Sequence, residues 1–287
     1  MKKEIVMIIG ATGIGKSSLA IQKAKEINAE IISADAFQVY TGMDIGTAKI
    51  SKEEQKEVPH HLIDIQTPDT PYSVASFLEQ CNVLIPDIQN RGKQVIICGG
   101  TALYTKAFLY QYEFEAESVP SEQYYSLLEE SRSKDPHFLW EKLKQVDPNS
   151  AQKIPYQNHR RLAKALDYFY QKGTPISTRQ HQIPRSDTNC IGISANRSMI
   201  YDRINKRVDQ MIEKGLIEEV QTLSNQFPKS SPGFQGIGYK EVISYLDGDT
   251  TKEEMIDCIK KRTRQFAKRQ LTWYRTFEHV KWIDATE

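Results

Sequence analysis

A glycine-rich loop near the amino terminus constrains the fold of this chain more than any other segment. The loop fits the pattern G-x-x-x-x-G-K-[ST] and consists of Gly10, Ala11, Thr12, Gly13, Ile14, Gly15, Lys16 and Ser17. An apolar, β-branched run precedes it and a helical pattern follows it, so we expect a strand, this loop and a helix in that order. The glycines let backbone amide N–H groups point toward phosphate oxygens. The N-terminus of the following helix and the lysine add positive charge, and the serine hydroxyl can hold Mg²⁺. The loop predicts a site for a di- or triphosphate.

Two other interpretations of the loop are weaker. It could be a tight strand-to-helix turn that binds nothing, but a chance match to the whole pattern is rare in a chain of this length. A Rossmann dinucleotide loop would show the spacing GxGxxG, whereas this chain has GxxGxG. Asp35 falls about where a ribose-binding acid would, yet the GK[ST] ending favours a phosphate-binding loop, or P-loop.

Further strand-like runs follow the loop. Residues 30–34 lead to Asp35, and residues 94–98 lead to Gly99-Gly100-Thr101. Strands that alternate with helices predict crossover connections, so we expect an α/β fold, with a P-loop core built on a parallel sheet and helices on both faces. Ligands of such sheets bind beyond the carboxyl ends of the strands, where Gly10, Asp35 and Thr101 fall.

The pattern of the sequence changes near residue 120. From there to about residue 181 the chain has many charges, no strand-like run, and helical patterns that break at Asp-Pro and Gly-Thr-Pro steps. We therefore expect a helical insertion domain over 119–189, between the two parts of the catalytic core at 1–118 and 190–287. A short apolar run over 190–193 is expected to return the chain to the sheet.

The net charge of +1 hides an asymmetry between the two halves of the chain. Residues 1–150 carry 15 basic and 21 acidic side chains, whereas residues 151–287 carry 23 and 16. A basic half suggests that part of the surface meets a polyanion. No stretch approaches the roughly 20 apolar residues of a membrane span, and four scattered cysteines indicate neither a disulfide framework nor a zinc site. We expect a reduced, cytoplasmic monomer that does not contact membranes.

The last long helical pattern is rich in cations. We expect amphipathic helices over 200–224 and 252–277, separated by a glycine-rich turn over 233–240. The stretch 260–275 holds seven basic side chains and no acid, with aromatic side chains between them. Alone, such a helix is usually a solvated face. Beside the basic half of the chain it favours contacts to RNA phosphates, for which Lys268 and Arg269 are the candidates.

One expected partner of an ATP-hydrolysing loop is missing. Such loops are accompanied by an Asp that closes an apolar strand and supports Mg²⁺. The strand over 94–98 ends in Gly-Gly-Thr instead, and Leu62-Ile63-Asp64 is a poor strand. The bound phosphate is therefore expected to be a leaving group rather than an energy source. His60 and His61 lack carboxylate or cysteine partners at ligand spacing, so no metal site is expected there.

Together, these segments resemble the tRNA dimethylallyltransferases of the bacterial type. The resemblance covers nearly the whole chain and rests on the loop and on segments 33–40, 42–49, 59–64, 99–104, 161–166, 236–241 and 263–273. The sequence departs from the family pattern at Ala11 and Ile14 of the loop, at Ala36, where serine is common, and at Lys164, where arginine is common. No zinc-finger pattern of the kind found in eukaryotic relatives follows Trp282 in this sequence, so we expect an enzyme of the bacterial type.

The resemblance implies a Mg²⁺-dependent transfer of the dimethylallyl group from dimethylallyl diphosphate. The acceptor is N6 of adenosine 37, in the anticodon stem-loop of tRNAs that decode codons beginning with U, and diphosphate is released. An exocyclic adenine amine is a poor nucleophile, so a positioned proton acceptor is needed, and Asp35 is our candidate base. Asp35 could instead cap a helix or hydrogen-bond to the ligands of Mg²⁺ without contacting the ion. The Thr101 hydroxyl is implied to contact the bridging oxygen, or else it caps a strand end. Lys16 and Ser17-bound Mg²⁺ would neutralise the leaving group.

Two arginines and several further segments complete the expected site. Arg203 and Arg207 are four residues apart on a helical pattern and therefore share a face, where two guanidinium groups can clamp a diphosphate. The resemblance favours Arg207, and surface ion pairs with Asp202 or Asp209 are the alternative. The resemblance also implies contacts to tRNA by Asp35, Ala36, Phe37, Gln38, Thr101, Arg160, Arg161, Lys164, Gln235, Gly236, Ile237, Gly238, Tyr239 and Lys240.

Three alternative functions share parts of this pattern. A P-loop small-molecule kinase would use the same loop, but it would need the missing strand-terminal Asp and would not need a basic carboxyl-terminal half. Prenyl transfer to a free adenine nucleotide would need neither the helical insertion nor the basic helix. A non-catalytic RNA-binding module would leave the phosphate cradle without a use.

Overall fold

The computed structural model describes residues 4–112, 121–178 and 184–285. It divides into two compact units, a core unit made of residues 1–110 and 184–287 and a helical unit made of residues 111–183. The expected boundaries lay at 118/119 and 189/190, and that each unit is a separate domain stays a prediction.

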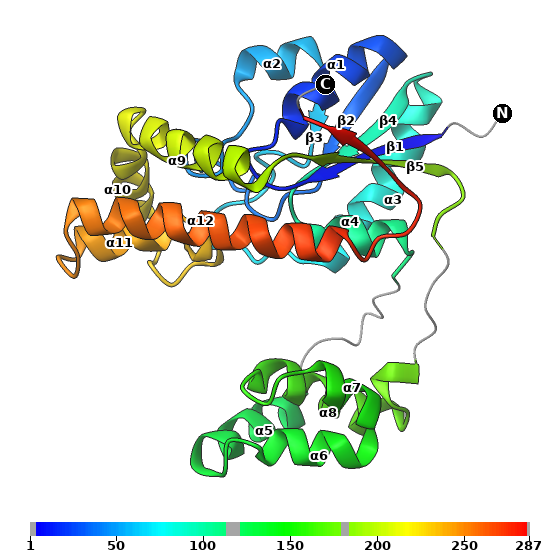
Figure 1. The fold of residues 1–287 in the computed structure, drawn as a ribbon, viewed down its shortest axis with the longest axis vertical. Helices are drawn as coiled ribbons and strands as arrows, with labels where there is room; N and C mark the ends of the chain where they lie inside the picture. The colour runs from blue at the N-terminus through cyan, green and yellow to red at the C-terminus, as the bar shows by residue number, and fades with distance from the viewer. Residues whose placement is uncertain (1–3, 113–120, 179–183, 286–287) are drawn as a thin grey trace. The chain divides into compact units, whose positions relative to one another are not determined.

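The core unit is built on one six-stranded sheet in which every pair of neighbouring strands is parallel. Strand order is β3-β2-β4-β1-β5-β6 (Figure 1). The central strands are rich in isoleucine and valine, and every residue of β1 and β2 is buried, as parallel strands covered on both faces require. The strands are β1 (Ile5–Gly10), β2 (Ala29–Ser33), β3 (His60–His61), β4 (Gln94–Cys98), β5 (Thr188–Ser194) and β6 (Val280–Asp284).

Helices cover both faces of this sheet. Figure 1 shows α1 on one face, with α3 and α4 on the other. The expected α/β class with a parallel sheet is thus confirmed. The helices of the core unit are α1 (Lys16–Ile27), α2 (Lys52–Glu57), α3 (Val74–Asn90), α4 (Ala102–Leu109), α9 (Arg197–Glu213), α10 (Leu216–Gln226), α11 (Tyr239–Leu246) and α12 (Lys252–Tyr274), with a short 3-10 helix at Pro232–Gln235.

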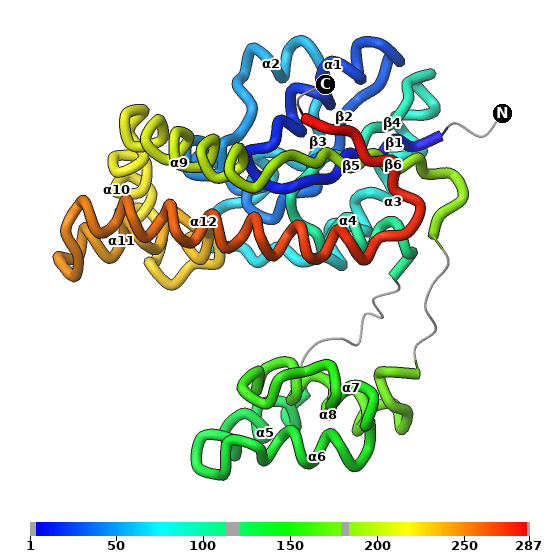
Figure 2. Tube along the Cα trace, in the orientation of Figure 1, coloured from blue at the N-terminus to red at the C-terminus, as the bar shows by residue number. Residues whose placement is uncertain are grey.

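The helices from α9 to α12 pack around a second apolar core beside the sheet. Its buried members include Val208 of α9, Leu216 of α10, Val242 of α11 and Ile259 of α12. Figure 2 follows this part of the chain from α9 to α12 and then into β6, which adds the last strand to the sheet. The carboxyl-terminal helices are therefore fixed to the same body that carries the phosphate loop.

The structure corrects two of the expected elements. The single helix expected over 200–224 is two helices, because Gly215 adopts a left-handed φ of 96° that ends α9 and starts α10. The expected return strand over 190–193 extends over Thr188–Ser194. Strands β3 and β6 were not expected, since a two-residue strand and a five-residue segment with two charged side chains, Val280–Asp284, carry little strand signal.

The helical unit contains four helices and a short 3-10 helix among its described residues. They are α5 (Glu122–Ser133), α6 (Phe138–Val146), α7 (Pro148–Lys153), α8 (His159–Lys172) and the 3-10 helix at Ile176–Thr178. The breaks fall where the sequence predicts them: at Asp135-Pro136, at Asp147, which caps α7, and at Gly173, whose φ of 69° ends α8. The helices enclose their own apolar core around Leu127, Leu143 and Leu166.

Candidate functional site

The glycine-rich loop joins the end of β1 to the start of α1, as the sequence predicts. Gly13 and Gly15 have φ values of 78° and 106°, which L side chains rarely adopt, so glycine is needed at both positions. Ala11 and Ile14 are buried in the core and anchor the loop from below. Thr12 and Gly13 are half-buried, and Gly15 and Ser17 are exposed at the first turn of α1. The loop thus offers its backbone and the helix N-terminus to the surface.

Lys16 is the buried cation of this loop. Its Nζ donates a hydrogen bond to the carbonyl oxygen of Ala11 at 2.8 Å. Burial lowers the pKa of its ammonium group to about 8, although the nearby Cys98 and Asp35 act in the opposite direction. Such an ammonium group is poorly solvated, so an incoming anion would stabilise its charged form.

Asp35 follows β2 and presents one free carboxylate oxygen to the same region. Its Oδ1 accepts hydrogen bonds from the backbone N–H groups of Phe37 at 2.9 Å and Gln38 at 3.3 Å. Its Oδ2 accepts no hydrogen bond within the described part of the chain. These bonds form an Asx-type turn rather than the helix cap considered as an alternative, because the next described helix begins only at Lys52, and they occupy one of the two oxygens.

Gly100 marks the point at which the acid and the cation converge. A Cβ atom built on this glycine would lie 3.8 Å from Nζ of Lys16 and 3.9 Å from Oδ2 of Asp35. The next residue, Thr101, accepts a hydrogen bond from the N–H of Ala36 at 3.0 Å through its Oγ1. The ends of β1, β2 and β4 thus bring Lys16, Asp35 and Thr101 together, as the sheet topology predicts.

The two arginines expected to clamp a diphosphate have different surroundings. Arg207 is largely buried, burial lowers the pKa of its guanidinium, and Asp35 favours its charged form. Within the described residues this guanidinium forms no hydrogen bond or ion pair. Arg203 is exposed and donates to the carbonyl oxygen of Ile14 at 3.2 Å. Asp209, one of the expected alternative partners, instead pairs with Lys260 at 2.6 Å.

One residue of this region, Gln270, is not among the site residues that the sequence predicts. Gln270 of α12 is 2% exposed, and its side chain contacts both Thr12 of the loop and Gly100. It lies in the cation-rich stretch 260–275, whose charges are the more prominent feature of the sequence. The available signal was its position three residues after Ala267 and four before Tyr274, which are also buried and define the inner face of the helix.

The segment 35–38 lies against the glycine-rich turn near α11. A Cβ atom on Gly236 would be 3.1 Å from the ring of Phe37. Gln38 accepts a hydrogen bond from Ser33 Oγ at 3.0 Å. In the turn, Gln235 and Lys240 are exposed, Ile237 is half-buried, and Gly238 is buried with a φ of 102°. Contact of these residues with tRNA stays a prediction.

Tyr239 is held inside the protein rather than at its surface. Its side chain is buried, and its hydroxyl donates to Oε1 of Glu219 at 2.7 Å. The same carboxylate accepts backbone N–H groups of Asp44, Ile45 and Gly46 at 2.9, 2.7 and 3.2 Å. Glu219 therefore ties the segment 44–46 to α10 and α11, a role for which the sequence gives no spacing signal.

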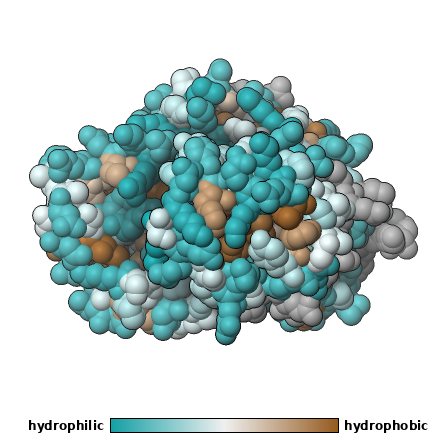
Figure 3. All heavy atoms as spheres, turned by 90° about the horizontal axis from the view of Figure 1, so that it is seen from below, coloured by the Kyte–Doolittle hydropathy of each residue, from teal (hydrophilic) through white to brown (hydrophobic). Residues whose placement is uncertain are grey.

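The cations of α12 divide into paired and unpaired groups. Arg262 pairs with Glu241 at 2.5 Å, and Lys260 pairs with Asp209. Lys268 and Arg269 are exposed and have no partner within the described ranges. In the helical unit, Arg160, Arg161 and Lys164 are exposed on α8. Hydrophilic side chains also predominate on the face of the molecule drawn in Figure 3, with small hydrophobic patches between them.

The residues considered for a metal are engaged in other contacts. Asp64 pairs with Lys49 at 2.6 Å and with Lys52 at 2.9 Å. His61 contacts Glu30 at 2.7 Å. No group of three or more His, Cys, Asp or Glu side chains is placed to hold a metal ion among the residues that the structure describes.

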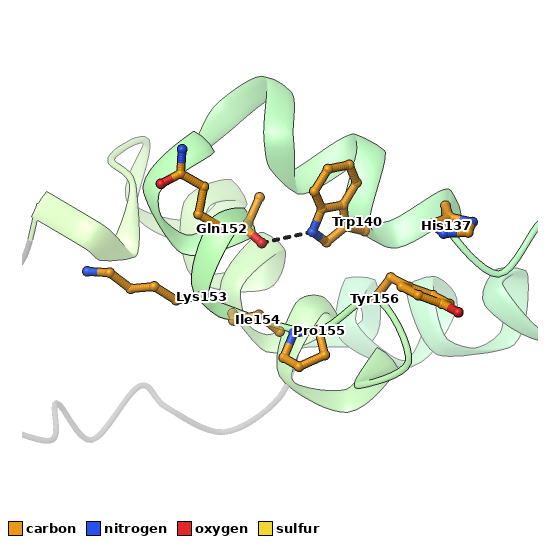
Figure 4. Close-up of a pocket in the computed structure, with 8 residues that line it drawn as sticks. His137, Trp140, Gln152, Lys153, Ile154, Pro155 and Tyr156 are labelled. Atoms are coloured by element: carbon orange, nitrogen blue, oxygen red, sulfur yellow. Dashed lines mark hydrogen bonds between the residues drawn. The ribbon is translucent and has the colours of Figure 1, made fainter.

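Cavities in the described structure include a small one beside the loop and a larger one in the helical unit. One of about 20 Å³ adjoins the loop and is lined by Ser17, Gln38 and apolar side chains such as Ile31. A larger one of about 470 Å³ lies in the helical unit, between His137, Trp140 and the segment 151–156 (Figure 4). There Trp140 Nε1 donates to the carbonyl oxygen of Ala151 at 2.8 Å. The larger cavity contains none of the expected site residues.

Fold and site together define an α/β protein with a P-loop motif at the carboxyl edge of a parallel sheet. A family model described as IPP transferase matches residues 38–277. Curated relatives named tRNA dimethylallyltransferase include those of Acetivibrio thermocellus, 43% identical over 99% of this chain and 92% of the relative, and Geobacillus thermodenitrificans, 44% identical over 100% and 92%. The chain belongs to this family, the IPP transferases or tRNA dimethylallyltransferases.

Solved structures are similar over the whole chain. The full-length tRNA isopentenylpyrophosphate transferase of Bacillus halodurans is 41% identical, with a TM-score of 0.74 over 99% of this chain and 90% of that one. A eukaryotic dimethylallyltransferase acting on tRNA is 29% identical, with a TM-score of 0.85 over 99% and 74%. Across the described ranges, no helix is long and apolar enough to span a membrane.

Proposed function

We propose that this chain transfers the dimethylallyl group of dimethylallyl diphosphate to N6 of adenosine 37 in the anticodon loop of tRNAs that decode codons beginning with U. The observation that carries the proposal is the convergence of a carboxylate oxygen of Asp35 and the ammonium group of Lys16 around Gly100, beside a phosphate loop. Alkylation of an amine by an allylic diphosphate needs a proton acceptor and a cation for the leaving group at one place.

The phosphate loop would hold the diphosphate of the donor. Amide N–H groups of the loop, the N-terminus of α1 and Lys16 would neutralise its charge. Arg207 is suited to a second contact, because its buried guanidinium has no partner among the described residues and its charge is stabilised only by Asp35. Arg203 would support the loop through the carbonyl oxygen of Ile14.

Asp35 would accept the proton of the nucleophile. As N6 forms a bond to C1 of the dimethylallyl group, the bond from C1 to the bridging oxygen breaks and diphosphate leaves with that electron pair. The N6 proton passes to Oδ2 of Asp35, while Oδ1 keeps its two backbone contacts and fixes the carboxylate. The Thr101 hydroxyl uses its oxygen to accept from Ala36, so its hydrogen can be donated to the bridging oxygen.

Mg²⁺ fits this site only as an ion held mainly by the donor. The chain offers the exposed hydroxyl of Ser17 at the first turn of α1, without a cluster of acids in the described residues. Mg²⁺ commonly keeps several waters and binds substrate phosphates with few protein ligands. When bound, it would neutralise charge on the diphosphate.

tRNA would be bound by surfaces on both units. We assign the segment 35–38 and the turn 235–240 to the neighbourhood of the target base, and the exposed cations of α8 and α12 to the RNA backbone. A base that must leave its stack needs a lined pocket, and the packing of Phe37 on Gly236 provides one wall. We also propose that the enzyme works as a cytoplasmic monomer.

The test is incubation with unmodified tRNA and radiolabelled dimethylallyl diphosphate, followed by nucleoside analysis, with AMP and ATP offered in parallel. Label on adenosine 37 supports the proposal. Label on free AMP would favour the nucleotide prenyltransferase, and consumption of ATP without isoprenoid on RNA would favour a kinase. A tRNA with guanosine at position 37 is the matched control substrate.

A further inference from the structure

Gln270 joins two backbone segments of the site that are far apart in the sequence. Its Oε1 accepts a hydrogen bond from the N–H of Thr12 at 2.8 Å, and its Nε2 donates to the carbonyl oxygen of Gly100 at 2.6 Å. Thr12 belongs to the phosphate loop after β1, and Gly100 belongs to the turn after β4. One side chain from α12 therefore connects the phosphate loop to the turn after β4.

The chemistry of this bridge requires a side chain that accepts one hydrogen bond and donates another. One end must accept a hydrogen bond from an N–H and the other end must donate one to a carbonyl, which a primary amide does in one orientation. A carboxylate would face the carbonyl oxygen of Gly100 with a second acceptor. A methionine would leave both backbone groups without a partner in a buried place.

The space around the bridge is closed. A Cβ atom on Gly100 would lie 2.8 Å from Nε2 of Gln270, so a side chain at this position would have to displace the amide of Gln270. One helical turn further along α12, the hydroxyl of Tyr274 approaches the carbonyl oxygen of Gly99 at 3.4 Å. The turn that leads into Thr101 is therefore attached to α12 at two successive carbonyl groups.

We propose that Gln270 is a positioning residue for the transfer reaction: it sets the separation between the phosphate loop and the turn that carries Thr101 and borders Asp35. The inference rests on the proposed function, because it assigns the leaving group to one side of the bridge and the base to the other. A nucleophile held against Asp35 can attack C1 in line only if that separation is kept.

The main variant is Gln270→Met, with Gln265→Met as the matched control on the exposed side of the same helix. Kinetic constants are measured on correctly folded protein, with the folded fraction checked by thermal unfolding. We expect kcat to fall about tenfold or more, with the KM for the donor changed only a few-fold, because the cradle itself survives. The control should keep both constants. Wild-type kcat in the folded Gln270→Met protein would overturn the proposal.

A second variant tests the hydrogen bonds themselves. In Gln270→Glu, the introduced carboxyl group can accept from Thr12 and donate to Gly100 only when it is protonated. The ratio of variant to wild-type kcat should therefore rise as the pH falls from 8 to 6. A ratio that stays constant with pH would contradict the bridge, and this readout remains available if Gln270→Met does not fold.

A third measurement separates failure of this inference from failure of the proposed function. Amide hydrogen exchange at Thr12 reports its bond to Gln270 without any substrate. If Thr12 loses its protection in Gln270→Met, the hydrogen-bonded bridge is supported, whatever the activity of the protein. If the wild-type protein also prenylates no RNA, the proposed function is wrong, and so is the role of Gln270 in the transfer reaction. If the exchange rate of the Thr12 amide is the same in Gln270→Met and in the wild-type protein, the bridge is contradicted but the proposed function is not.

Discussion

The inner and outer faces of α12 carry polar side chains in opposite circumstances. On the inner face, Gln270 is buried, and both the oxygen and the nitrogen of its amide form hydrogen bonds with backbone atoms of the site. On the outer face, Lys268 and Arg269 are exposed and have no partner among the described residues. The two faces belong to adjacent positions in the sequence, yet they are suited to different tasks.

The two faces illustrate two different contributions to function: the inner face preorganises the site, and the outer face attracts a polyanion. A buried polar group with fixed partners holds reacting parts at a set distance, so its effect is expected in kcat. An exposed cation acts on a polyanion through long-range charge, so its effect is expected in affinity and in the dependence on salt. Besides the tests of Gln270, changes at Asp35, Arg207, Lys268, Arg269 and Lys16 can break or sharpen this distinction.

The largest effect is expected for Asp35→Asn. The amide keeps an oxygen for the backbone N–H groups of Phe37 and Gln38 but cannot take the proton of N6, so transfer should slow about a thousandfold. The affinity for tRNA should stay within a few-fold, as measured by filter binding. Asp69→Asn, an exposed acid outside the site, is the control. Turnover at the wild-type rate would remove Asp35 as the base.

Asp35→Ala extends this test. It loses the base and the two hydrogen bonds that Oδ1 accepts, so it should be at least as inactive as the asparagine variant. A protein with Asp35→Ala that is more active than Asp35→Asn would indicate that the carboxylate is needed to hold the segment 35–38 and not to accept a proton.

The next effect is expected for Arg207→Met. Loss of a charge-assisted contact from a buried guanidinium should weaken binding of inorganic diphosphate about 30-fold. Titration calorimetry measures this directly. Arg203→Met, one turn away on α9, should weaken binding less, because Arg203 contacts the loop through the carbonyl oxygen of Ile14. Equal losses in the two variants would contradict the distinction between the buried and the exposed arginine.

Neutralising the outer face of α12 should give a smaller change of another kind. The double variant Lys268→Gln and Arg269→Gln should weaken tRNA binding about tenfold at physiological salt and lower the slope of log K against log salt by about two. At saturating tRNA, kcat should be unchanged. Lys56→Gln with Lys281→Gln removes the same charge outside α8 and α12 and is the control. An unchanged slope would show that this face does not touch the RNA backbone.

The smallest effect is expected from pH. Lys16 has a pKa of about 8 in the folded protein, so its charge is lost as the pH rises from 7 to 9. Binding of inorganic diphosphate should therefore weaken several-fold over that range. In Lys16→Met the part of the pH dependence that belongs to this group should vanish. An identical pH dependence in both proteins would contradict the assignment.

A rise in pH has the opposite effect on the contribution of Lys16 to stability: diphosphate binding weakens, whereas this contribution increases. Between the folded pKa of about 8 and the ordinary value of 10.5, the unfolded chain binds more protons at Lys16 than the folded chain does. The contribution of this residue to the free energy of unfolding therefore increases as the pH rises through that window. Denaturant unfolding of the wild-type and Lys16→Met proteins at pH 8 and 10 measures the difference.

Much of the core fold could be predicted because its signals are local. The strands that became β1, β2 and β4 are short β-branched runs bounded by glycine or polar residues, and the breaks of the helical unit fall at Asp-Pro steps and Gly173. Gly215 was missed as a break, because an amphipathic pattern continues on both sides of it. Strand β6 was missed because its pairing with β5 is decided by the tertiary structure.

The sequence by itself determined the loop, the parallel sheet and the order of Lys16, Asp35 and Thr101 at its carboxyl edge, because glycine spacing and strand runs are properties of neighbouring residues. Only the tertiary structure decided which polar groups are buried and paired. Gln270 reaches Thr12 across 258 positions of sequence, and Glu219 gathers three amides of a distant segment. Such contacts depend on how α10 and α12 pack, and no local pattern encodes a hydrogen bond between residues so far apart.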